Sequence, residues 1–281
     1  MFLFSDLVEK KGGALVMGIL NVTPDSFSDG SEAFTQTDVL EKLNRLCNDG
    51  ADIIDIGACS TAPNNIIVSE EEEIRRLKLF LPDIVKNSTV PVSIDTFRPR
   101  VAEYALSQGV SIINDESGCF DEDMAALVKR YNCGWIFMHT GNRSSKETAV
   151  YENGVMNDVL SFFDEMKRNA IIYGIDENQL CFDCGIGFGK TRDDDITLLS
   201  NCDILSQYSL LLIGTSRKRV IGEITGESDP KKRVQGSVAV ATIVCADGAS
   251  VVRVHDVKET VEAVNVIKSL QRGVYNGKDN Y

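Results

Sequence analysis

Eight short apolar runs along this chain each end in polar side chains that are able to do chemistry. These polar residues are Asn21, Asp55, Asp95, Asn114, His139, Asp183, Lys218 and the pair Arg253 and His255. A carboxylate accepts two N–H bonds from an amino-pyrimidine edge, and an Asn amide both donates and accepts. We therefore expect Asp95, Asn114, Asp183 and Lys218 to converge on one cavity suited to a flat, hydrogen-bond-rich heterocycle. The alternative is that each of them caps a helix or bonds to backbone at the rim.

The last run carries two groups suited to an oxyanion. Arg253 and His255 are two positions apart on an expected strand, so both side chains lie on one face. Loops after the last two strands of a barrel often bind phosphate, and a guanidinium matches an oxyanion well. The alternative for His255 is a buried, hydrogen-bonded histidine.

The runs that lead to these residues are apolar and rich in β-branched residues, as in parallel strands buried on both faces. We expect strands at 14–20, 51–56, 90–95, 110–114, 134–139, 179–183, 209–215 and 250–255. Segments with helical periodicity follow them, at 38–48, 69–86, 99–108, 122–131, 153–173, 193–206, 230–247 and 257–271. This alternation predicts a (β/α)8 TIM barrel of the α/β class, whose active site lies at the C-terminal strand ends.

The barrel is expected to occupy the whole chain as one domain. No linker or shift in composition divides residues 1–281, so we place the barrel at about 14–272 and a tail at 273–281. Three long loops, at 21–37, 57–68 and 140–152, lie on the side of the polar strand ends. Loops of this length usually serve as lids or binding loops.

Composition narrows the range of partners. The net charge of −13 argues against nucleic acid or an anionic membrane, because both repel such a surface. The N-terminal segment has no basic region before an apolar core, and no apolar run is long enough to span a membrane. Eight scattered cysteines are expected to be reduced, as in a cytoplasmic protein.

Two other patterns are weaker. The segment GIGFGK at 185–190 lacks the third glycine of a dinucleotide fingerprint and follows the sixth strand rather than the first. Its glycines would instead let backbone approach a flat ligand. Cys181 and Cys184 are three apart, which on a strand puts them on opposite faces and disfavours a dithiol or zinc site.

Six motifs together resemble those of dihydropteroate synthase, the folate-pathway enzyme family inhibited by sulfonamides. They are MGILNVTPDSFSDG (17–30), SIDT (93–96), IIND (112–115), DCGIGFGK (183–190), LLIGTSRK (211–218) and VRVHD (252–256). The resemblance covers roughly residues 15–270. It implies condensation of 6-hydroxymethyl-7,8-dihydropterin pyrophosphate with 4-aminobenzoate, which gives 7,8-dihydropteroate and pyrophosphate. It also implies Mg²⁺ as cofactor, sulfonamides as inhibitors and a homodimer.

The resemblance also implies a role for individual residues. The pterin would be held by Asp95, Asn114, Met138, Asp183, Lys218 and Arg253. Asn21 would bind Mg²⁺ and pyrophosphate, and Arg253 and His255 would hold the phosphates. The 4-aminobenzoate would lie against Thr61, Pro63, Phe188, Ser216 and the stem of Lys218. Asp25, Phe27 and Asp29 would close over the site, and Asp29, Asp183 and Lys218 would take part in an SN1-like reaction.

The second loop departs from the family pattern. It reads GACSTAPN at 57–64, where the family usually has GGESTRPG, so Ala62 replaces an arginine that helps to hold pyrophosphate. Loss of one phosphate-binding arginine costs about 1.5–3 kcal/mol, which is roughly a 10- to 100-fold loss of affinity. We expect Arg143, Lys146 or a water-rich Mg²⁺ site to compensate.

Two alternatives to an active synthase remain open. One is a paralogue that binds pterin but catalyses poorly because of Ala62, and the other is a pterin-dependent methyltransferase domain. The intact first loop and the SRK motif favour the synthase over the methyltransferase. The expected helix at 230–247 is apolar around most of its circumference, which is consistent with a dimer interface.

Overall fold

The computed structural model describes residues 1–22, 35–59, 68–141 and 148–272. These residues form a closed parallel barrel whose eight strands follow chain order and whose first strand pairs with the last. The strands are β1 (Leu15–Asn21), β2 (Ile53–Gly57), β3 (Val92–Asp95), β4 (Ile112–Asp115), β5 (Gly134–Met138), β6 (Leu180–Asp183), β7 (Leu211–Ile213) and β8 (Val251–Val254). The expected (β/α)8 fold is confirmed.

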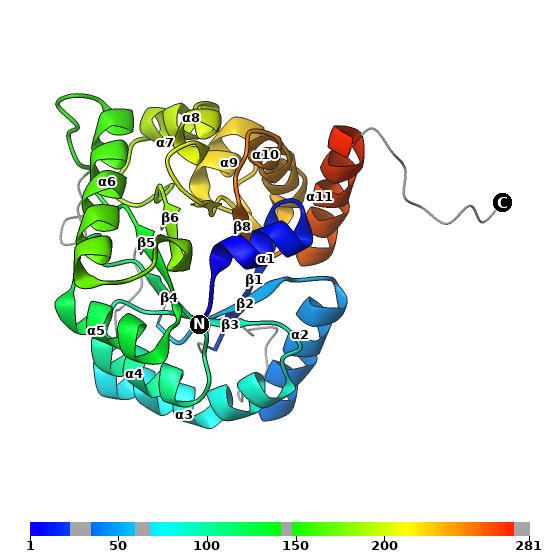
Figure 1. Cartoon of the computed structure of the whole chain (residues 1–281). Helices are drawn as coiled ribbons and strands as arrows, with labels where there is room; N and C mark the ends of the chain where they lie inside the picture. Colours follow the sequence, from blue (N-terminus) through cyan, green and yellow to red (C-terminus); the bar gives the residue numbers. More distant parts are fainter. Residues whose placement is uncertain (23–34, 60–67, 142–147, 273–281) are drawn as a thin grey trace.

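Helices surround the barrel and return the chain from one strand to the next (Figure 1). They are α1 (Phe4–Lys11), α2 (Gln36–Asn48), α3 (Glu70–Asn87), α4 (Pro99–Ser107), α5 (Glu122–Tyr131), α6 (Val155–Tyr173), α7 (Arg192–Ser200), α8 (Cys202–Ser206), α9 (Arg219–Thr225), α10 (Val234–Ala246) and α11 (Val257–Arg272). Two 3-10 turns, η2 (Glu177–Gln179) and η3 (Pro230–Lys232), precede β6 and α10.

Alternation along each strand separates an inner core from an outer one. Inward side chains form a compact cluster in the barrel, and its strand residues are Leu15, Met17, Ile53, Ile112, Ile136, Cys181, Leu212 and Val251. The residues between them face the helices and form the larger outer core. Burial of both faces explains why the strands are continuous apolar runs.

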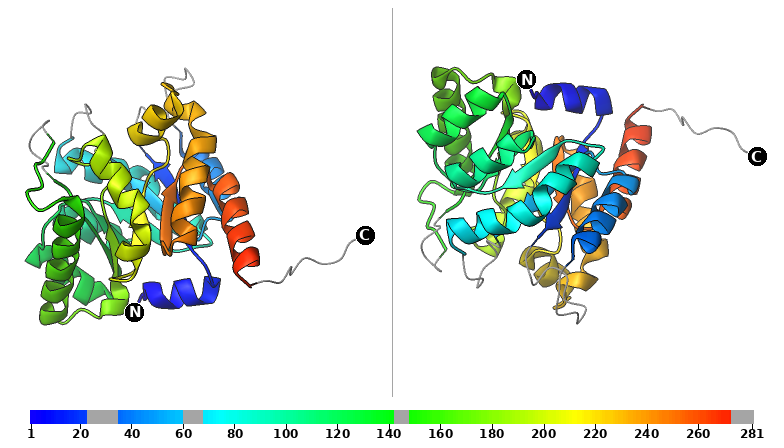
Figure 2. Two further views of the ribbon diagram at one scale, coloured as in Figure 1. Left: turned by 90° about the horizontal axis from the view of Figure 1, so that it is seen from above. Right: turned by 90° about the horizontal axis from the view of Figure 1, so that it is seen from below.

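Helix α1 closes the N-terminal end of the barrel and was not expected from the sequence. It lies across one end of the molecule (Figures 1 and 2). Phe4 is fully buried in the inner cluster, and its ring meets Phe2 edge to face with centroids 5.0 Å apart. A helix of eight residues has too few turns for a reliable periodicity, so tertiary packing rather than local pattern stabilises it.

Three other helical segments differ from expectation. The helix expected at 193–206 is broken at Asn201, whose non-helical φ of −122° and ψ of 31° separate α7 from α8. The segment expected at 230–247 begins with η3, so α10 itself starts at Val234. Helix α9 was missed because it is short and contains Gly222, against which the guanidinium of Arg233 packs.

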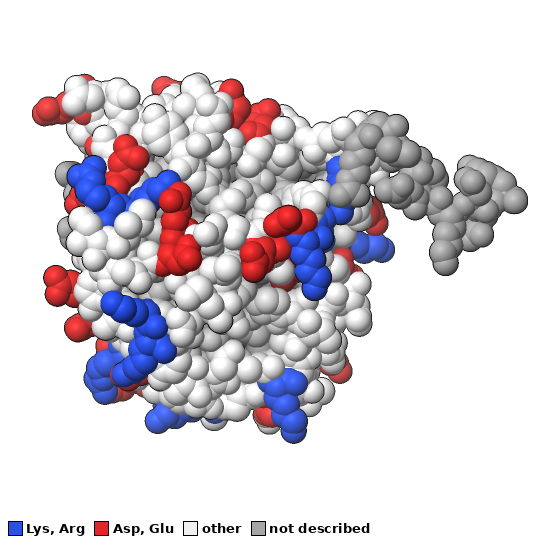
Figure 3. All heavy atoms as spheres, in the orientation of Figure 1, with Lys and Arg blue, Asp and Glu red and all other residues white. Residues whose placement is uncertain are grey.

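On the face that carries α1, acidic and basic groups are scattered in small clusters among uncharged atoms (Figure 3). Within the described part of the chain, no helix is long and apolar enough to cross a membrane. All eight cysteines are unpaired, and six of them are buried.

Candidate active site

A guanidinium and two carboxylates cross-link three strands at the C-terminal end of the barrel. Arg253 on β8 donates from Nε to Asp55 Oδ2 and from Nη2 to Asp95 Oδ2, each at 2.6 Å. Asn114 on β4 donates to the same Asp55 oxygen at 3.1 Å. Strand alternation points all four side chains into the barrel, so Asp55, which received no role from the sequence, anchors Arg253 and Asn114.

A second group from β6 and β7 faces the first. Gly185 N donates to Asp183 Oδ1 at 2.7 Å, and Lys218 Nζ donates to the Ile186 carbonyl at 2.7 Å. A methyl group at Gly214 would lie within 4 Å of Lys218 Nζ, Asp183 Oδ2 and Arg253 Cβ. The absence of a side chain at Gly214 therefore leaves space where the two groups meet. The expected convergence of Asp95, Asn114, Asp183 and Lys218 is observed.

Burial shifts the pKa values of the two carboxyl groups and of the ammonium in this site. Burial raises the pKa of Asp183, although Lys218 and the Gly185 N–H oppose the shift. The pKa of Asp95 is also raised, first by burial and then by Glu116, against the opposing charge of Arg253. Burial lowers the pKa of Lys218. A ligand with hydrogen-bond donors for the carboxylates and an acceptor for the ammonium would stabilise the charged forms of these buried groups.

The loop after β6 is held by a buried lysine that was not recognised in the sequence. Lys190 Nζ donates to the carbonyls of Gly185, His139 and Phe188 at 3.0, 3.2 and 3.3 Å. Burial lowers its pKa to about 8. Gly185 has φ of 67°, and a Cβ atom built on it would lie 1.9 Å from the His139 carbonyl oxygen. Any residue larger than glycine is therefore excluded at this position. This loop places Phe188 under Lys218, whose Nζ is 4.7 Å from the ring centroid.

The rim near β8 carries the groups expected to hold phosphate. Ser216 Oγ accepts from His255 N at 3.1 Å and lies 3.2 Å from its Nδ1. Desolvation and then the nearby charges of Arg217 and Arg253 lower the pKa of His255, so its ring is neutral near pH 7. Arg217 makes two hydrogen bonds to Asp256. A cavity of about 480 Å³ opens beside these residues and reaches α2.

Asn21 ends β1 close to the carboxylate of Asp95. A methyl group built on the intervening Gly57 would lie 2.8 Å from Asn21 Oδ1 and 3.7 Å from Asp95 Oδ2. Among the described residues, no group of three His, Cys, Asp or Glu side chains could hold a metal ion. Mg²⁺ needs few protein oxygens when it is shared with phosphates and water, so the Asn21 amide oxygen fits such a site as one ligand.

Two expected strand-end residues differ in their surroundings. Met138 is buried on β5 between Phe137 and His139. His139 turns outward, where its Nε2 lies 2.8 Å from Asp158 on α6 and its ring meets Phe162 edge to face. His139 is therefore part of the packing between β5 and α6, although its position at a strand end had suggested a functional role.

Several expected site residues lie outside the described part of the chain. They are Asp25, Phe27, Asp29, Thr61, Ala62, Pro63, Arg143 and Lys146. The roles assigned to them from the resemblance therefore remain predictions.

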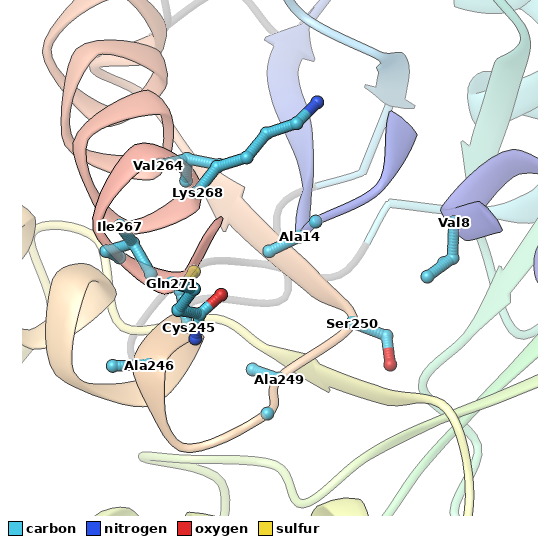
Figure 4. Close-up of a pocket in the computed structure, with 12 residues that line it drawn as sticks. Val8, Ala14, Cys245, Ala246, Ala249, Ser250, Val264, Ile267, Lys268 and Gln271 are labelled. Carbon is cyan, nitrogen blue, oxygen red and sulfur yellow. The ribbon is translucent and has the colours of Figure 1, made fainter. Parts of the chain in front are cut away.

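A second cavity, of about 220 Å³, lies at the opposite end of the barrel (Figure 4). Its lining includes Ala14 and Ser250, which precede β1 and β8, and Lys268 from α11. This cavity contains none of the polar strand ends described above and is not the candidate site.

Comparison with known sequences gives a consistent result. A family model described as pterin binding enzyme matches residues 17–255. The chain is 38% identical to the dihydropteroate synthase of Bacillus subtilis over 271 residues, which covers 95% of this chain and 93% of that protein. It is 40% identical to the dihydropteroate synthase of Clostridium beijerinckii, over 92% of this chain and 94% of that one.

Solved structures agree in fold. The dihydropteroate synthase of Xanthomonas albilineans with 4-aminobenzoic acid superposes with a TM-score of 0.86 at 37% identity, covering 92% of this chain and 93% of that one. A structure of the same bacterium's enzyme with 7,8-dihydropteroate gives 0.82 at 36% identity, with 92% and 94% covered. The Yersinia pestis enzyme in complex with a sulfonamide drug gives 0.85 at 34% identity, with 93% and 95% covered.

Proposed function

This chain belongs to the pterin-binding enzymes and, within them, to the dihydropteroate synthase family, and from that premise we propose how its site works. It is a transferase of folate biosynthesis that joins 6-hydroxymethyl-7,8-dihydropterin pyrophosphate to 4-aminobenzoate. The observation that carries this conclusion is the convergence of Asp95, Asn114, Asp183 and Lys218 on the space beside Gly214. This constellation has the donors and acceptors that an amino-pterin edge requires.

The pterin ring is held by groups on opposite walls. Asp95 and Asp183 accept ring N–H groups, and Lys218 donates to a ring oxygen or nitrogen. Two nitrogens of Arg253 bond to Asp55 and Asp95, which fixes the guanidinium beside the proposed pterin pocket. Met138, which is buried on β5, is proposed to pack against the ring.

The reaction breaks the bond between the pterin methylene carbon and pyrophosphate. Positive charge spreads into the ring as pyrophosphate departs, so an SN1-like step is favoured, and the buried carboxylates of Asp95 and Asp183 stabilise that charge. Asp29 is proposed to assist them. The weakly basic aromatic amine then attacks the methylene carbon, and it needs positioning more than a strong base.

Pyrophosphate is proposed to leave toward Asn21, Arg253 and His255. Asn21 would supply one oxygen ligand to a bound Mg²⁺, which would contribute positive charge to offset that of the departing anion. A neutral His255 contributes an N–H bond to the phosphate oxygens. Its hydrogen bond to Ser216 Oγ sets the orientation of the ring.

The 4-aminobenzoate is proposed to lie between Phe188, Ser216 and the aliphatic stem of Lys218, with Thr61 and Pro63 closing the pocket. The position of Phe188 beneath Lys218 supports this arrangement. Sulfonamides, which resemble 4-aminobenzoate in shape, would occupy the same pocket. Asp25 and Phe27 are proposed to close over both substrates and to exclude water, which would otherwise capture the carbocation.

The cellular compartment and the oligomeric state are also proposals. Eight unpaired cysteines fit a reducing cytoplasm, because such a number would form disulfides in an oxidising compartment. A homodimer is proposed through α10, whose Ile243 is 58% exposed. Neither nucleic acid nor a membrane is proposed as a partner.

The decisive experiment is dihydropteroate formation by the purified protein with Mg²⁺, the pterin pyrophosphate and labelled 4-aminobenzoate. We expect turnover that falls by at least about 100-fold in Asp95→Ala, because a buried hydrogen-bonded carboxylate is lost and Arg253 is left partly unpaired. Tight binding of pterin pyrophosphate without turnover would instead identify a paralogue disabled by Ala62. An Arg143→Ala variant with unchanged pyrophosphate affinity would contradict compensation by that arginine.

A further inference from the structure

A buried carboxyl group at the end of β4 takes no part in the proposed reaction. The side chain of Glu116 follows β4 directly, and the residue is only 4% exposed. Its Oε2 is fully buried and makes no hydrogen bond to any described residue. An unsatisfied buried acceptor is costly, so its retention at a binding site needs an explanation.

Strand geometry directs Glu116 into the candidate site. Asn114 points inward to Asp55, whereas Asp115 points outward and accepts the indole N–H of Trp135 at 3.3 Å. Alternation therefore turns Glu116 inward again. Asp115 is paired with Phe137, so continuing the register sets Glu116 level with Met138, which is itself paired with Asp183.

The charge of Glu116 acts on the groups already placed in the site. It is the largest charge effect that raises the pKa of Asp95, and it also acts on Arg253 and Lys218. Glu116 thus belongs to the same cluster as Asp55, Asp95 and Asp183, where four carboxyl groups face two cations. This excess of acceptors suits a ring that is rich in N–H donors and gains positive charge as it reacts.

We propose that Glu116 is an additional ligand of the pterin ring, whose Oε2 accepts a ring or amino N–H when substrate binds. The proposal rests on the proposed function and adds to it a recognition residue outside the motifs that carry the family resemblance. In the unliganded protein the acceptor is unsatisfied, and the ligand satisfies it. Glu116 should therefore contribute to affinity at the expense of the stability of the empty protein.

The test measures binding of 6-hydroxymethylpterin by calorimetry and thermal unfolding of the unliganded protein. For Glu116→Leu we expect affinity to fall about 10-fold or more, while the melting temperature stays level or rises. For the nearly isosteric Glu116→Gln we expect a smaller loss, roughly 5-fold, because a neutral acceptor replaces a charged one. Glu122→Leu, at an exposed glutamate in the first turn of α5, is the matched control and should bind like the unmodified protein.

Each outcome separates this inference from the proposed function. If the unmodified protein does not bind the pterin, the proposed function is wrong. If it binds, and both Glu116 variants bind equally well, the pterin-ligand role of Glu116 is overturned. If Glu116→Leu lowers the melting temperature sharply, Glu116 also stabilises the fold, and the test then depends on Glu116→Gln. Unchanged pterin affinity in Glu116→Gln would overturn the inference.

Discussion

At the mouth of the barrel, the direction in which a strand points each side chain decides whether that side chain reaches the candidate site. Asp95, Asn114, Asp183 and Lys218 could be predicted because each ends an apolar run and carries a group that binds heterocycles. The directions of the His139 and Glu116 side chains could not be predicted, because a shift of one residue at the end of an expected strand reverses the face on which a side chain lies. Lys190 was missed because its three acceptors are backbone carbonyls, which leave no pattern in the sequence.

The outward-facing histidine leads to a prediction about acid stability. Burial, with the charge of Lys190, lowers the pKa of His139 from 6.5 to about 4 despite the opposing hydrogen bond to Asp158. Between these values the unfolded chain binds a proton that the folded protein does not, so stability is complete above pH 6.5 and falls as pH decreases toward 4. Between pH 7 and 4.5 this histidine should cost about 2–3 kcal/mol of the free energy of unfolding.

Urea denaturation of the unmodified protein and of His139→Gln, at both pH values, measures this contribution. Gln can still donate to Asp158 but does not titrate in this range. We expect the variant to lose correspondingly less stability on acidification, with other carboxylates contributing equally to both proteins. Parallel losses in the two proteins would contradict the assignment.

At the scale of elements, the loop after β6 connects the residues proposed to hold the pterin with those proposed to hold 4-aminobenzoate. Its Ile186 carbonyl accepts from Lys218, and its Phe188 ring lies beneath the same ammonium. Lys190 holds the loop from below through three carbonyls. The positions of Lys218 and Phe188 therefore depend on a residue for which no substrate contact is proposed.

Lys190→Met should accordingly affect catalysis without removing any substrate contact. Three carbonyls lose their donor in the variant, so we expect about 1–3 kcal/mol less stability and a fall in kcat/KM of roughly 10-fold or more. The KM for 4-aminobenzoate should rise more than the Kd for the pterin, because Lys190 bonds directly to the carbonyl of Phe188, which is proposed to line the 4-aminobenzoate pocket. Lys129→Met is the control, since Lys129 is exposed and donates to a single carbonyl, that of Tyr173. Normal kinetics in Lys190→Met would show that the loop holds its shape without the ammonium.

At the end of the barrel remote from the site, α1 contributes to stability rather than to catalysis. Phe4 fills the bottom of the inner cluster, so Phe4→Ala should cost about 3–5 kcal/mol of stability. At temperatures where the variant stays folded, kcat and both KM values should be close to those of the unmodified protein, because the site lies at the other end of the barrel. Chemical denaturation and steady-state kinetics check both parts. A large change in KM at full folding would mean that the inner core transmits strain to the site.

For the whole molecule, the order and type of the strands followed from the sequence because each is a distinct apolar run bounded by turn residues. The helix boundaries followed less well. The break at Asn201 coincides with a local bond from Asn201 Nδ2 to the Thr197 carbonyl that competes with the helix. Helix α10 starts late because the chain first forms η3, which the Asp229 side chain caps. The expected long loops fall between β1 and α2, β2 and α3, and β5 and α6, and much of each lies outside the described part of the chain, so their contribution to the site stays a prediction.

The apolar surface of α10 leads to the prediction for the assembly. Ile243 on α10 is 58% exposed, and α10 packs against α11, whose Val266 and Leu270 are also exposed. Exposed apolar side chains on neighbouring helices favour association of two copies, because burial of this surface releases water.

Light scattering after size-exclusion chromatography should give twice the 30.9 kDa mass of one chain, and Ile243→Glu should shift the protein toward the monomer. Ile172→Glu, on α6 across the barrel and 77% exposed, should remain a dimer (Figure 1). A monomeric unmodified protein, or an Ile243→Glu variant that stays dimeric, would contradict an interface at α10.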